Sequence, residues 1–444
     1  MYIKPVAISL ALAQISGMAI AAGSIQEYWK SFRAGVDPHN ITLPKIPQTT
    51  SYDGVAECTY YTPPAELQFK DSEWPTPWLT ATSNGMNTSA EFKALYNSID
   101  WTKAPNIPVR QLLPDGSVDM SKYDEANDPD CWWSATTCTK PKHQNVNEDI
   151  YACPEPDTWG LTYDDGPNCS HNAFYDYLEE QKLKATMFYI GSNVVDWPYG
   201  AMRGMKDGHH IADHTWSHQL MTTLNNQEVL AELYYTQKAI KLTTGVTPRH
   251  WRPAFGDVDD RVRWIATQLN LTTILWNLDT DDWAAGSTKP LATVQQSYDD
   301  FIQMGSNGTF GTSGNIVLTH EIDNTTMQLA VENLPKIQKA YTHVLDVATC
   351  MNITHPYMED TVTVKTFDEV VGGKKASTSG AASSAASASS QPSNGVVKAA
   401  SASGSLSSSS SSSSADASPS NSAAFQVSPN MAAMAVMAAL AIFI

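Results

Sequence analysis

An apolar run that ends in two adjacent carboxylates and a Gly-Pro turn constrains this chain more than any other stretch. Residues 158–163 read as a buried strand, and Asp164 and Asp165 follow directly. Because Gly166-Pro167 forces the chain to turn at once, both acids are expected at the carboxyl end of that strand, where α/β folds place their chemistry. Two neighbouring carboxylates near a core repel each other, which indicates that a cation or a strong hydrogen-bond donor shares the site.

Two histidines further along the chain offer the remaining ligands of a metal site. His214 and His218 are four residues apart, which on a helical turn would place both rings on one face, at the spacing of two imidazole ligands. With Asp165 they form a set that leaves coordination positions for water, which is typical of hydrolytic rather than structural sites. Two surface histidines would show the same spacing, and the Asp-Asp turn is what favours the metal site.

Three more stretches carry polar residues at predicted strand ends. They are Trp251-Arg252-Pro253-Ala254-Phe255-Gly256, Leu278-Asp279-Thr280-Asp281-Asp282-Trp283 after the apolar run 273–278, and Ile316-Val317-Leu318-Thr319-His320. With the acidic turn and the histidine pair they resemble the five motifs of carbohydrate esterase family 4, the NodB-homology polysaccharide deacetylases, and within it the fungal chitin deacetylases. The resemblance covers the middle of the chain, from Thr162 to His320. One departure is Ala254, which stands where the family usually has proline and predicts a less rigid turn.

The residues themselves indicate a mechanism of amide hydrolysis. A metal ion held by the three ligands above would polarise a carbonyl and lower the pKa of a water molecule. Asp164 would be free to take the proton of that water as general base, and His320, from a different strand end, is the candidate acid for the departing amine. A backbone N–H near Phe255 would help to stabilise the oxyanion.

The family resemblance implies the same roles and adds supporting ones. Arg252 would orient the general base, and Asp282 would pair with His320 and keep its ring protonated. Trp283 and Leu318 would line the pocket for the acetyl methyl group, although both could equally be ordinary core residues. The implied cofactor is a divalent metal, zinc or cobalt.

Alternating strands and helices in the middle of the chain predict a parallel α/β sheet with helices outside. Residues 185–190 read as a strand, and three amphipathic helices are predicted at 227–243, 291–304 and 327–340. The resemblance implies a distorted (β/α) barrel of the NodB-homology type over residues 150–361, with the motifs on one rim. Residues 23–149 show little periodicity and are predicted to form an irregular N-terminal extension that wraps this domain.

Both ends of the chain carry signals of export. Residues 1–22 combine one early cation, an apolar core and a small-residue end, as in a cleaved secretory signal. Residues 373–424 are rich in Ser, Ala and Gly, which predicts a disordered, O-glycosylated stalk. Residues 425–444 form a spacer and an apolar tail too short to span a membrane, typical of a glycosylphosphatidylinositol (GPI) attachment signal with Asn421 or Ser420 as the attachment site.

The charge and the glycosylation signals agree with a secreted protein. The formal net charge of −18 disfavours nucleic acid and anionic membrane surfaces as partners and suits a neutral or cationic ligand. Asn168 begins a sequon beside the acidic turn and is not counted as a glycosylation site. The predicted sites are Asn40, Asn87, Asn270, Asn307, Asn324 and Asn352.

Six cysteines in an exported chain are expected to form disulfides, and their spacing leaves all fifteen pairings open. None has zinc-finger spacing. The resemblance implies a bond between Cys153 and Cys350, at the two ends of the catalytic domain. A bond between Cys131 and Cys138 is a further prediction.

The predicted function is hydrolysis of the N-acetyl groups of β-1,4-linked N-acetylglucosamine in chitin, which gives chitosan and acetate. The protein is expected to act as a monomer at the cell wall and the outer face of the plasma membrane, held by a GPI lipid only. The same site would also serve another N-acetylglucosamine polymer or O-acetyl xylan. A wall mannoprotein that binds chitin without turnover is the alternative of a different class, against which stands the presence of every predicted ligand and catalytic residue.

Overall fold

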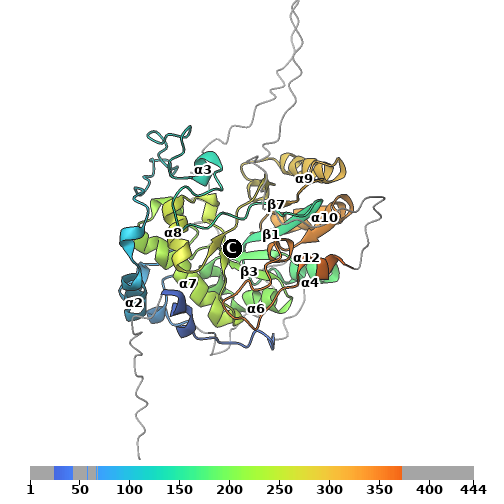
Figure 1. Cartoon of the computed structure of the whole chain (residues 1–444). Coiled ribbons are helices and arrows are strands. Elements are labelled where there is room, and N and C mark those ends of the chain that lie inside the picture. Colours follow the sequence, from blue (N-terminus) through green and yellow to red (C-terminus); the bar gives the residue numbers. More distant parts are fainter. Residues whose placement is uncertain (1–24, 44–57, 59–66, 68, 373–444) are drawn as a thin grey trace, which may run out of the picture.

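The computed structural model describes residues 25–43, 58, 67 and 69–372, and its centre is a parallel sheet of eight strands (Figure 1). The order is β5-β4-β3-β2-β1-β7-β6, with β8 beside the amino-terminal half of β1. All pairings between strands are parallel. The strands are β1 (Thr158–Gly166), β2 (Thr186–Tyr189), β3 (His210–Asp213), β4 (His250–Trp251), β5 (Thr272–Thr273), β6 (Leu278–Asp279), β7 (Asn315–Leu318) and β8 (His343–Leu345).

A four-residue crossing joins the two edges of this sheet. β5 lies at one edge and β6 at the other, yet only residues 274–277 separate them in sequence. Because four residues span at most about 14 Å, the edges must approach each other and the sheet curls into an incomplete barrel. The predicted single run 273–278 is therefore wrong as one strand, since its two ends pair with different neighbours. The predicted distorted (β/α) barrel is confirmed.

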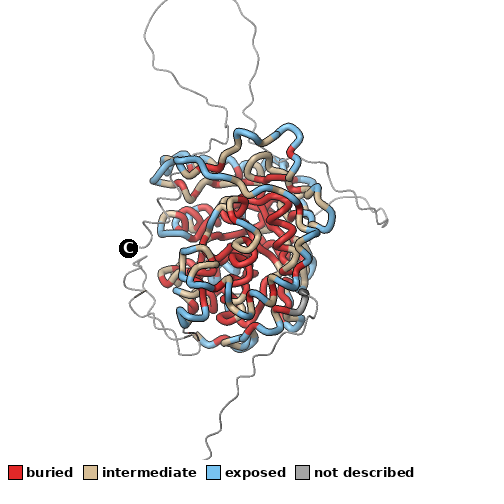
Figure 2. Tube along the Cα trace, turned by 90° about the vertical axis from the view of Figure 1, so that its left-hand side faces the viewer, coloured by how far each residue is buried: buried red, intermediate tan, exposed pale blue. Residues whose placement is uncertain are grey.

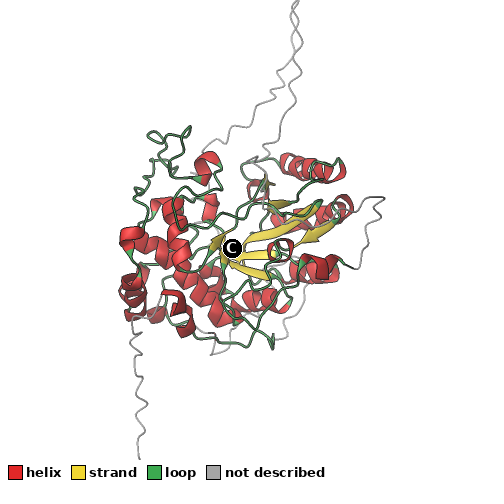
Figure 3. Ribbon diagram, in the orientation of Figure 1, coloured by secondary structure: helices red, strands yellow, loops and turns green. Residues whose placement is uncertain are grey.

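Helices surround the strands in the centre (Figure 3). The predicted helices 227–243, 291–304 and 327–340 correspond to α7, α9 and α10, and the strand 185–190 to β2. The helices are α2 (Ala90–Ser98), α3 (Trp133–Thr136), α4 (Asn172–Glu180), α5 (Gly191–Asp196), α6 (Pro198–Lys206), α7 (Asn226–Thr244), α8 (Asp260–Gln268), α9 (Leu291–Ser306), α10 (Asn324–Ala340), α11 (Val347–Cys350) and α12 (Phe367–Val371). Figure 2 shows that the buried residues lie in the middle of the molecule and the exposed residues at its periphery.

The described parts of the predicted extension consist of short helices and turns that pack against the barrel. Its 3-10 helices are η1 (Ile25–Ser31), η3 (Asp71–Glu73), η4 (Ser83–Thr88) and η5 (Trp101–Lys103). Tyr28 donates a hydrogen bond to the side chain of Gln237 on α7 at 2.5 Å, and Trp74 stacks on Trp216 with ring centroids 6.2 Å apart. Tyr28, Trp74 and Trp216 are buried together in one core cluster with the barrel. The residue at which the catalytic domain begins stays a prediction.

Three disulfides connect the six cysteines, and two of them were predicted. Cys153, just before β1, is bonded to Cys350 at the end of α11, and Cys131 is bonded to Cys138. The third bond joins Cys58 of the extension to Cys169, just after the acidic turn. Spacing gives no sign of that bond, and it ties the extension to the barrel.

The predicted secretory signal, stalk and GPI signal, with Ser420 and Asn421, lie outside the described residues. Within the described part, no helix is long and apolar enough to cross a membrane. The described sequon asparagines at 40, 307, 324 and 352 are exposed, whereas Asn87 and Asn270 are partly buried. Glycosylation at all six stays a prediction.

Candidate active site

A β-bulge at the end of β1 turns both carboxylates toward one place. Asp164 lies opposite Phe188 of β2, but the next paired residue is Gly166, so Asp165 is the extra residue. Asp165 has a left-handed backbone, with φ of 74°, which breaks the alternation of side chains along the strand. As a result, Asp164 Oδ2 lies 3.7 Å and Asp165 Oδ1 lies 3.3 Å from the same atom, His214 Nε2.

The two histidines lie on an irregular loop after β3, so the predicted helical turn is wrong. Thr215 and His218 have left-handed φ angles of 67° and 52°, which a helix does not contain. Thr215 N–H donates to Asp213 Oδ1 at 2.8 Å, and His218 N–H donates to Thr215 Oγ1 at 3.2 Å. These local bonds fold the loop back so that both rings face Asp165.

Asp165, His214 and His218 fit a divalent metal ion. Their ligand atoms all lie within 4.8 Å of one another, and Asp165 Oδ1 is 3.3 Å from each Nε2. Asp165 Oδ1 is itself buried and has no hydrogen-bond partner. Because His214 Nδ1 is 2.8 Å from the carbonyl oxygen of Arg252, it must carry the proton, which leaves Nε2 as a lone-pair donor. One oxygen and two nitrogens are a ligand set of hydrolytic metal sites.

The pKa shifts of His218 and Asp165 favour the protonation states that a metal ligand needs. Burial lowers the pKa of His218 to about 4, which keeps this imidazole neutral near pH 7. Burial opposes the charged form of Asp165, but the surrounding His218, His214 and His320 lower its pKa well below the usual range. A neutral imidazole beside an anionic carboxylate is the form that binds a metal ion.

Arg252 fixes Asp164 in a buried ion pair. Its Nη1 donates to Asp164 Oδ1 at 2.7 Å and to Thr162 Oγ1 at 2.9 Å. The guanidinium also bonds the carbonyl oxygens of Ile274 and Leu275 in the crossing and lies over the ring of Phe188, with Cζ 4.1 Å from the centroid. The guanidinium thus holds Oδ1, while Oδ2 faces His214.

His320 follows β7 and is held by Asp282. Its Nδ1 lies 2.6 Å from Asp282 Oδ1, and its backbone N–H donates to Asp282 Oδ2 at 2.8 Å. Burial opposes a charged ring, but the Asp282 carboxylate outweighs it and raises the pKa of His320 to about 10. His320 also forms an isolated parallel bridge with Asp164, so the two side chains come from neighbouring strand ends.

The remaining predicted residues lie around these groups. Phe255 has a left-handed φ of 59°, and its ring centroid is 4.4 Å from that of His218. Trp283 is half-buried next to Asp282 in the 3-10 helix η8 (Asp282–Ala284), and Leu318 is the buried last residue of β7. The contact of either residue with an acetyl group stays a prediction.

Two buried carboxylates next to site residues in the sequence were not predicted. Glu321, the residue after His320, is fully buried, lies 2.8 Å from His171 Nδ1 and accepts a hydrogen bond from Tyr175 at 3.1 Å. Its position directly after a motif histidine is the one sequence signal that could have identified it. Asp257 follows the turn of Phe255 and accepts four hydrogen bonds.

Those four bonds hold the residue that directly follows the turn. Asp257 Oδ1 accepts from Trp132 Nε1 and Ser134 Oγ, both at 2.8 Å. Asp257 Oδ2 accepts from Thr222 N–H at 2.8 Å and from its hydroxyl at 2.7 Å. Asp257, which follows the turn with Ala254, is thus hydrogen-bonded from two sides, one of which is the extension. The lower rigidity of this turn stays a prediction.

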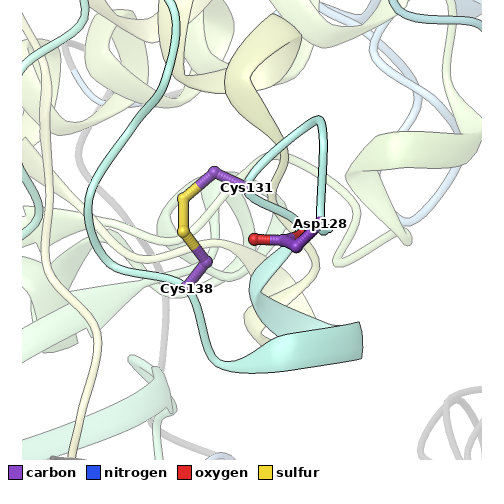
Figure 4. A group of neighbouring side chains, drawn as sticks. All are labelled: Asp128, Cys131 and Cys138. Carbon is purple, nitrogen blue, oxygen red and sulfur yellow. A yellow bond between two sulfur atoms is a disulfide. The ribbon is translucent and has the colours of Figure 1, made fainter. Parts of the chain in front are cut away.

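A second group of possible ligands does not form a metal site. Asp128, Cys131 and Cys138 lie close together (Figure 4), but both sulfurs are used in the disulfide. A disulfide sulfur cannot act as a thiolate ligand. Of the two groups found in the described part of the chain, only that of Asp165 has its ligand atoms available.

Comparisons with known proteins agree on one family. The family model of polysaccharide deacetylases matches residues 151–274. A chitin deacetylase of Amylomyces rouxii is 66% identical over 378 residues, which cover 85% of this chain and 88% of the relative. Chitin deacetylase 2 of Cryptococcus neoformans var. grubii is 48% identical over 329 residues, 73% of this chain and 71% of the relative.

Solved structures are similar over part of the chain. The chitin deacetylase from Colletotrichum lindemuthianum is 25% identical and matches with a TM-score of 0.44, over 48% of this chain and 96% of that one. The peptidoglycan deacetylase PdaC from Bacillus subtilis is 29% identical, with a TM-score of 0.38 over 44% of this chain.

Proposed function

The chain belongs to the polysaccharide deacetylase family, and from this membership and the site we propose that it hydrolyses the N-acetyl groups of β-1,4-linked N-acetylglucosamine in chitin, giving chitosan and acetate. The two close relatives whose names state this activity support the substrate. The observation that carries the proposal is the grouping of a three-ligand site with an Arg-paired carboxylate and an Asp-paired histidine on neighbouring strand ends.

Asp165, His214 and His218 would hold the divalent ion, with zinc or cobalt as the metals that suit two imidazoles and a carboxylate. When bound, such an ion supplies a Lewis acid that polarises the amide carbonyl and makes water a nucleophile near neutral pH.

Asp164 accepts the proton of the attacking water. Its Oδ1 is held by Arg252, so Oδ2, which faces His214, is the oxygen that takes the proton. General-base assistance of this kind contributes about 10²–10⁴-fold to the rate. The oxyanion that forms accepts a hydrogen bond from the backbone N–H near Phe255, beside His218.

His320 donates the proton that lets the amine leave. Its Nδ1 is engaged by Asp282, so Nε2 is the donating atom. A pKa of about 10 keeps the ring protonated at neutral pH, which an acid catalyst needs before the carbon–nitrogen bond breaks. Trp283 and Leu318 line the space of the acetyl methyl group.

Acetate release from soluble chitin oligomers tests the function. The purified, metal-loaded protein is expected to release acetate from N-acetylglucosamine oligomers, and the matched His320→Ala protein to lose about 10²–10⁴-fold of that rate while it still binds the oligomer. Acetylated xylan and acetylated peptidoglycan fragments serve as competing substrates. Binding of chitin oligomers without acetate release would instead identify a non-catalytic wall protein.

The protein is proposed to act outside the cell as a monomer. Three disulfides agree with an oxidising compartment. The apolar tail after the Ser-rich stalk supports GPI attachment at Ser420 or Asn421, which would place the enzyme beside its polymer at the cell wall.

A further inference from the structure

Glu232 is a fully buried carboxylate on α7 that the proposed reaction does not use. All four of its hydrogen-bond partners are donors, and these bonds oppose the rise in the pKa of Glu232 that burial causes. Oε2 accepts from the backbone N–H of Trp216 at 2.9 Å and of Ser217 at 2.8 Å. Oε1 accepts from the Ser217 hydroxyl and from the backbone N–H of Ala81, each at 2.8 Å.

Three of these four donors belong to the two residues between Thr215 and His218. That loop contains two left-handed residues, and such a strained conformation persists only where the surrounding structure imposes it. Hydrogen bonds to a carboxylate are roughly twice as strong as neutral ones. By holding two successive backbone N–H groups, Glu232 therefore offsets the strain that brings His218 round to face Asp165.

The fourth donor comes from the N-terminal extension, which covers the same loop at several points. Thr76 accepts a hydrogen bond from Trp216 Nε1 at 3.3 Å, and Trp74 stacks on the same indole. Ser192 accepts from the backbone N–H of Trp78 at 2.8 Å and donates to the carbonyl of Trp216 at 2.6 Å. Residues 74–81 and Glu232 thus hold the loop from two directions.

We propose that Glu232 is a positioning residue for the metal ion, which fixes the loop of His214 and His218 in its binding conformation together with Ala81 of the extension. The proposal rests on the proposed metal site. Side chains that orient metal ligands usually change metal affinity by about 10–100-fold when replaced.

Substitution of Glu232 by glutamine tests this role with little change of shape. Glutamine keeps one acceptor oxygen but places an NH2 group against N–H donors, so some of the four hydrogen bonds to residue 232 are lost. Metal-free Glu232→Gln protein titrated with Zn²⁺ is expected to bind about 10–100-fold more weakly than the unchanged protein. At saturating zinc its kcat should return to within about threefold, because no group that touches the substrate has changed.

Asp346→Asn is the matched control. Asp346 is also buried and accepts two hydrogen bonds, from the backbone and hydroxyl of Thr349, but it follows β8 near the amino-terminal ends of the strands, away from the site. The control is expected to lower the melting temperature and leave zinc affinity within twofold. Equal zinc affinities of Glu232→Gln and Asp346→Asn would overturn the proposal. Glu232 would then stabilise the fold without a specific effect on metal binding.

Two milder variants decide the matter if Glu232→Gln does not fold. Ser217→Ala removes one hydroxyl donor, and Ala81→Pro removes the donor from the extension. Ala81 is the second residue of the turn that Ser83 N–H closes on Thr80, a position that accepts proline. Each should weaken zinc binding about threefold or more, and unchanged affinity in both would refute the proposal. If the unchanged protein binds no zinc, the proposed metal site itself fails, which is a separate result.

Discussion

Asp164 and Asp165 are neighbours in sequence, yet their surroundings assign them different tasks. The side chain of Asp164 is 2% exposed and forms an ion pair with Arg252, whereas that of Asp165 is 15% exposed and lies between two imidazoles. The separation arises from the bulge, since a regular strand would send the two side chains to opposite faces.

Asparagine substitutions separate the two tasks. Asp165→Asn keeps a residue that tolerates a left-handed backbone but removes the anionic ligand, so metal content and turnover should fall together and recover in part with excess metal. Asp164→Asn should keep its metal and lose about 10²–10⁴-fold in kcat, with no rescue by metal. Metal content is measured by elemental analysis of the purified proteins. If the Asp164→Asn protein has lost its metal, Asp164 is the metal ligand and Asp165 the general base, the reverse of the proposed assignment.

The pH profile reports the pair of His320 and Asp282. Because the Asp282 carboxylate raises the pKa of His320 to about 10, the protonated acid is present at neutral pH and is lost as pH rises through that value. Asp282→Asn removes the raising charge while burial still lowers the pKa. The alkaline limb of the kcat profile should therefore move to lower pH.

Asp299→Asn, on the exposed face of α9, provides the control for that profile. It should leave the alkaline limb unchanged. An unchanged alkaline limb in Asp282→Asn as well would show that another group sets it.

At the scale of elements, the sequence predicted those parts whose pattern is local. α9 begins at Leu291 as predicted, because apolar periodicity runs through its whole length. α10 begins three residues before the predicted Met327, since Asp323 caps the backbone N–H groups of Thr325 and Thr326 and so adds a turn without apolar residues. The positions of these two helices thus follow from apolar periodicity, whereas the first turn of α10 follows from the capping residue Asp323.

Features that depend on tertiary contacts could not be predicted. Spacing gives the loop of His214 and His218 a helical appearance, whereas Glu232, sixteen residues after Trp216, imposes another conformation. Glu232 itself looks like an ordinary polar residue within the amphipathic pattern of α7. The bond between Cys58 and Cys169 is one of fifteen possible pairings and becomes visible only when the extension is folded onto the barrel.

The two predicted disulfides span very different lengths of sequence, so we expect them to contribute unequally to the free energy of unfolding. Cys153 and Cys350 are separated by 197 positions in the sequence, and Cys131 and Cys138 by 7. Loop-closure entropy gives about 5 kcal/mol for the first bond and about 2 kcal/mol for the second. Paired Cys→Ala variants compared by chemical denaturation should show this order. The reverse order would mean that strain or residual structure outweighs loop closure.

At the scale of the whole molecule, the proposed anchor can be tested separately from catalysis. Cleavage by a phosphatidylinositol-specific phospholipase should release the protein from membranes, and a chain that ends before Ser420 should enter the medium with its acetate-release activity unchanged. Membrane association of that shortened chain would rule out the GPI anchor.

We expect the barrel to unfold in one cooperative step because of the crossing of residues 274–277. Its amides donate to three separate segments: Ile274 to Trp251 of β4 at 2.8 Å, Leu275 to Ile150 at 2.7 Å, and Asn277 to Ile316 of β7 at 3.1 Å. No fraying of a single edge exposes all three. Hydrogen exchange at these amides should therefore proceed with one common free energy, close to that of global unfolding, and slower than at the turns of the rim. Exchange at residues 274–277, which belong to none of the five motifs, would thus measure the free energy of unfolding of the whole barrel.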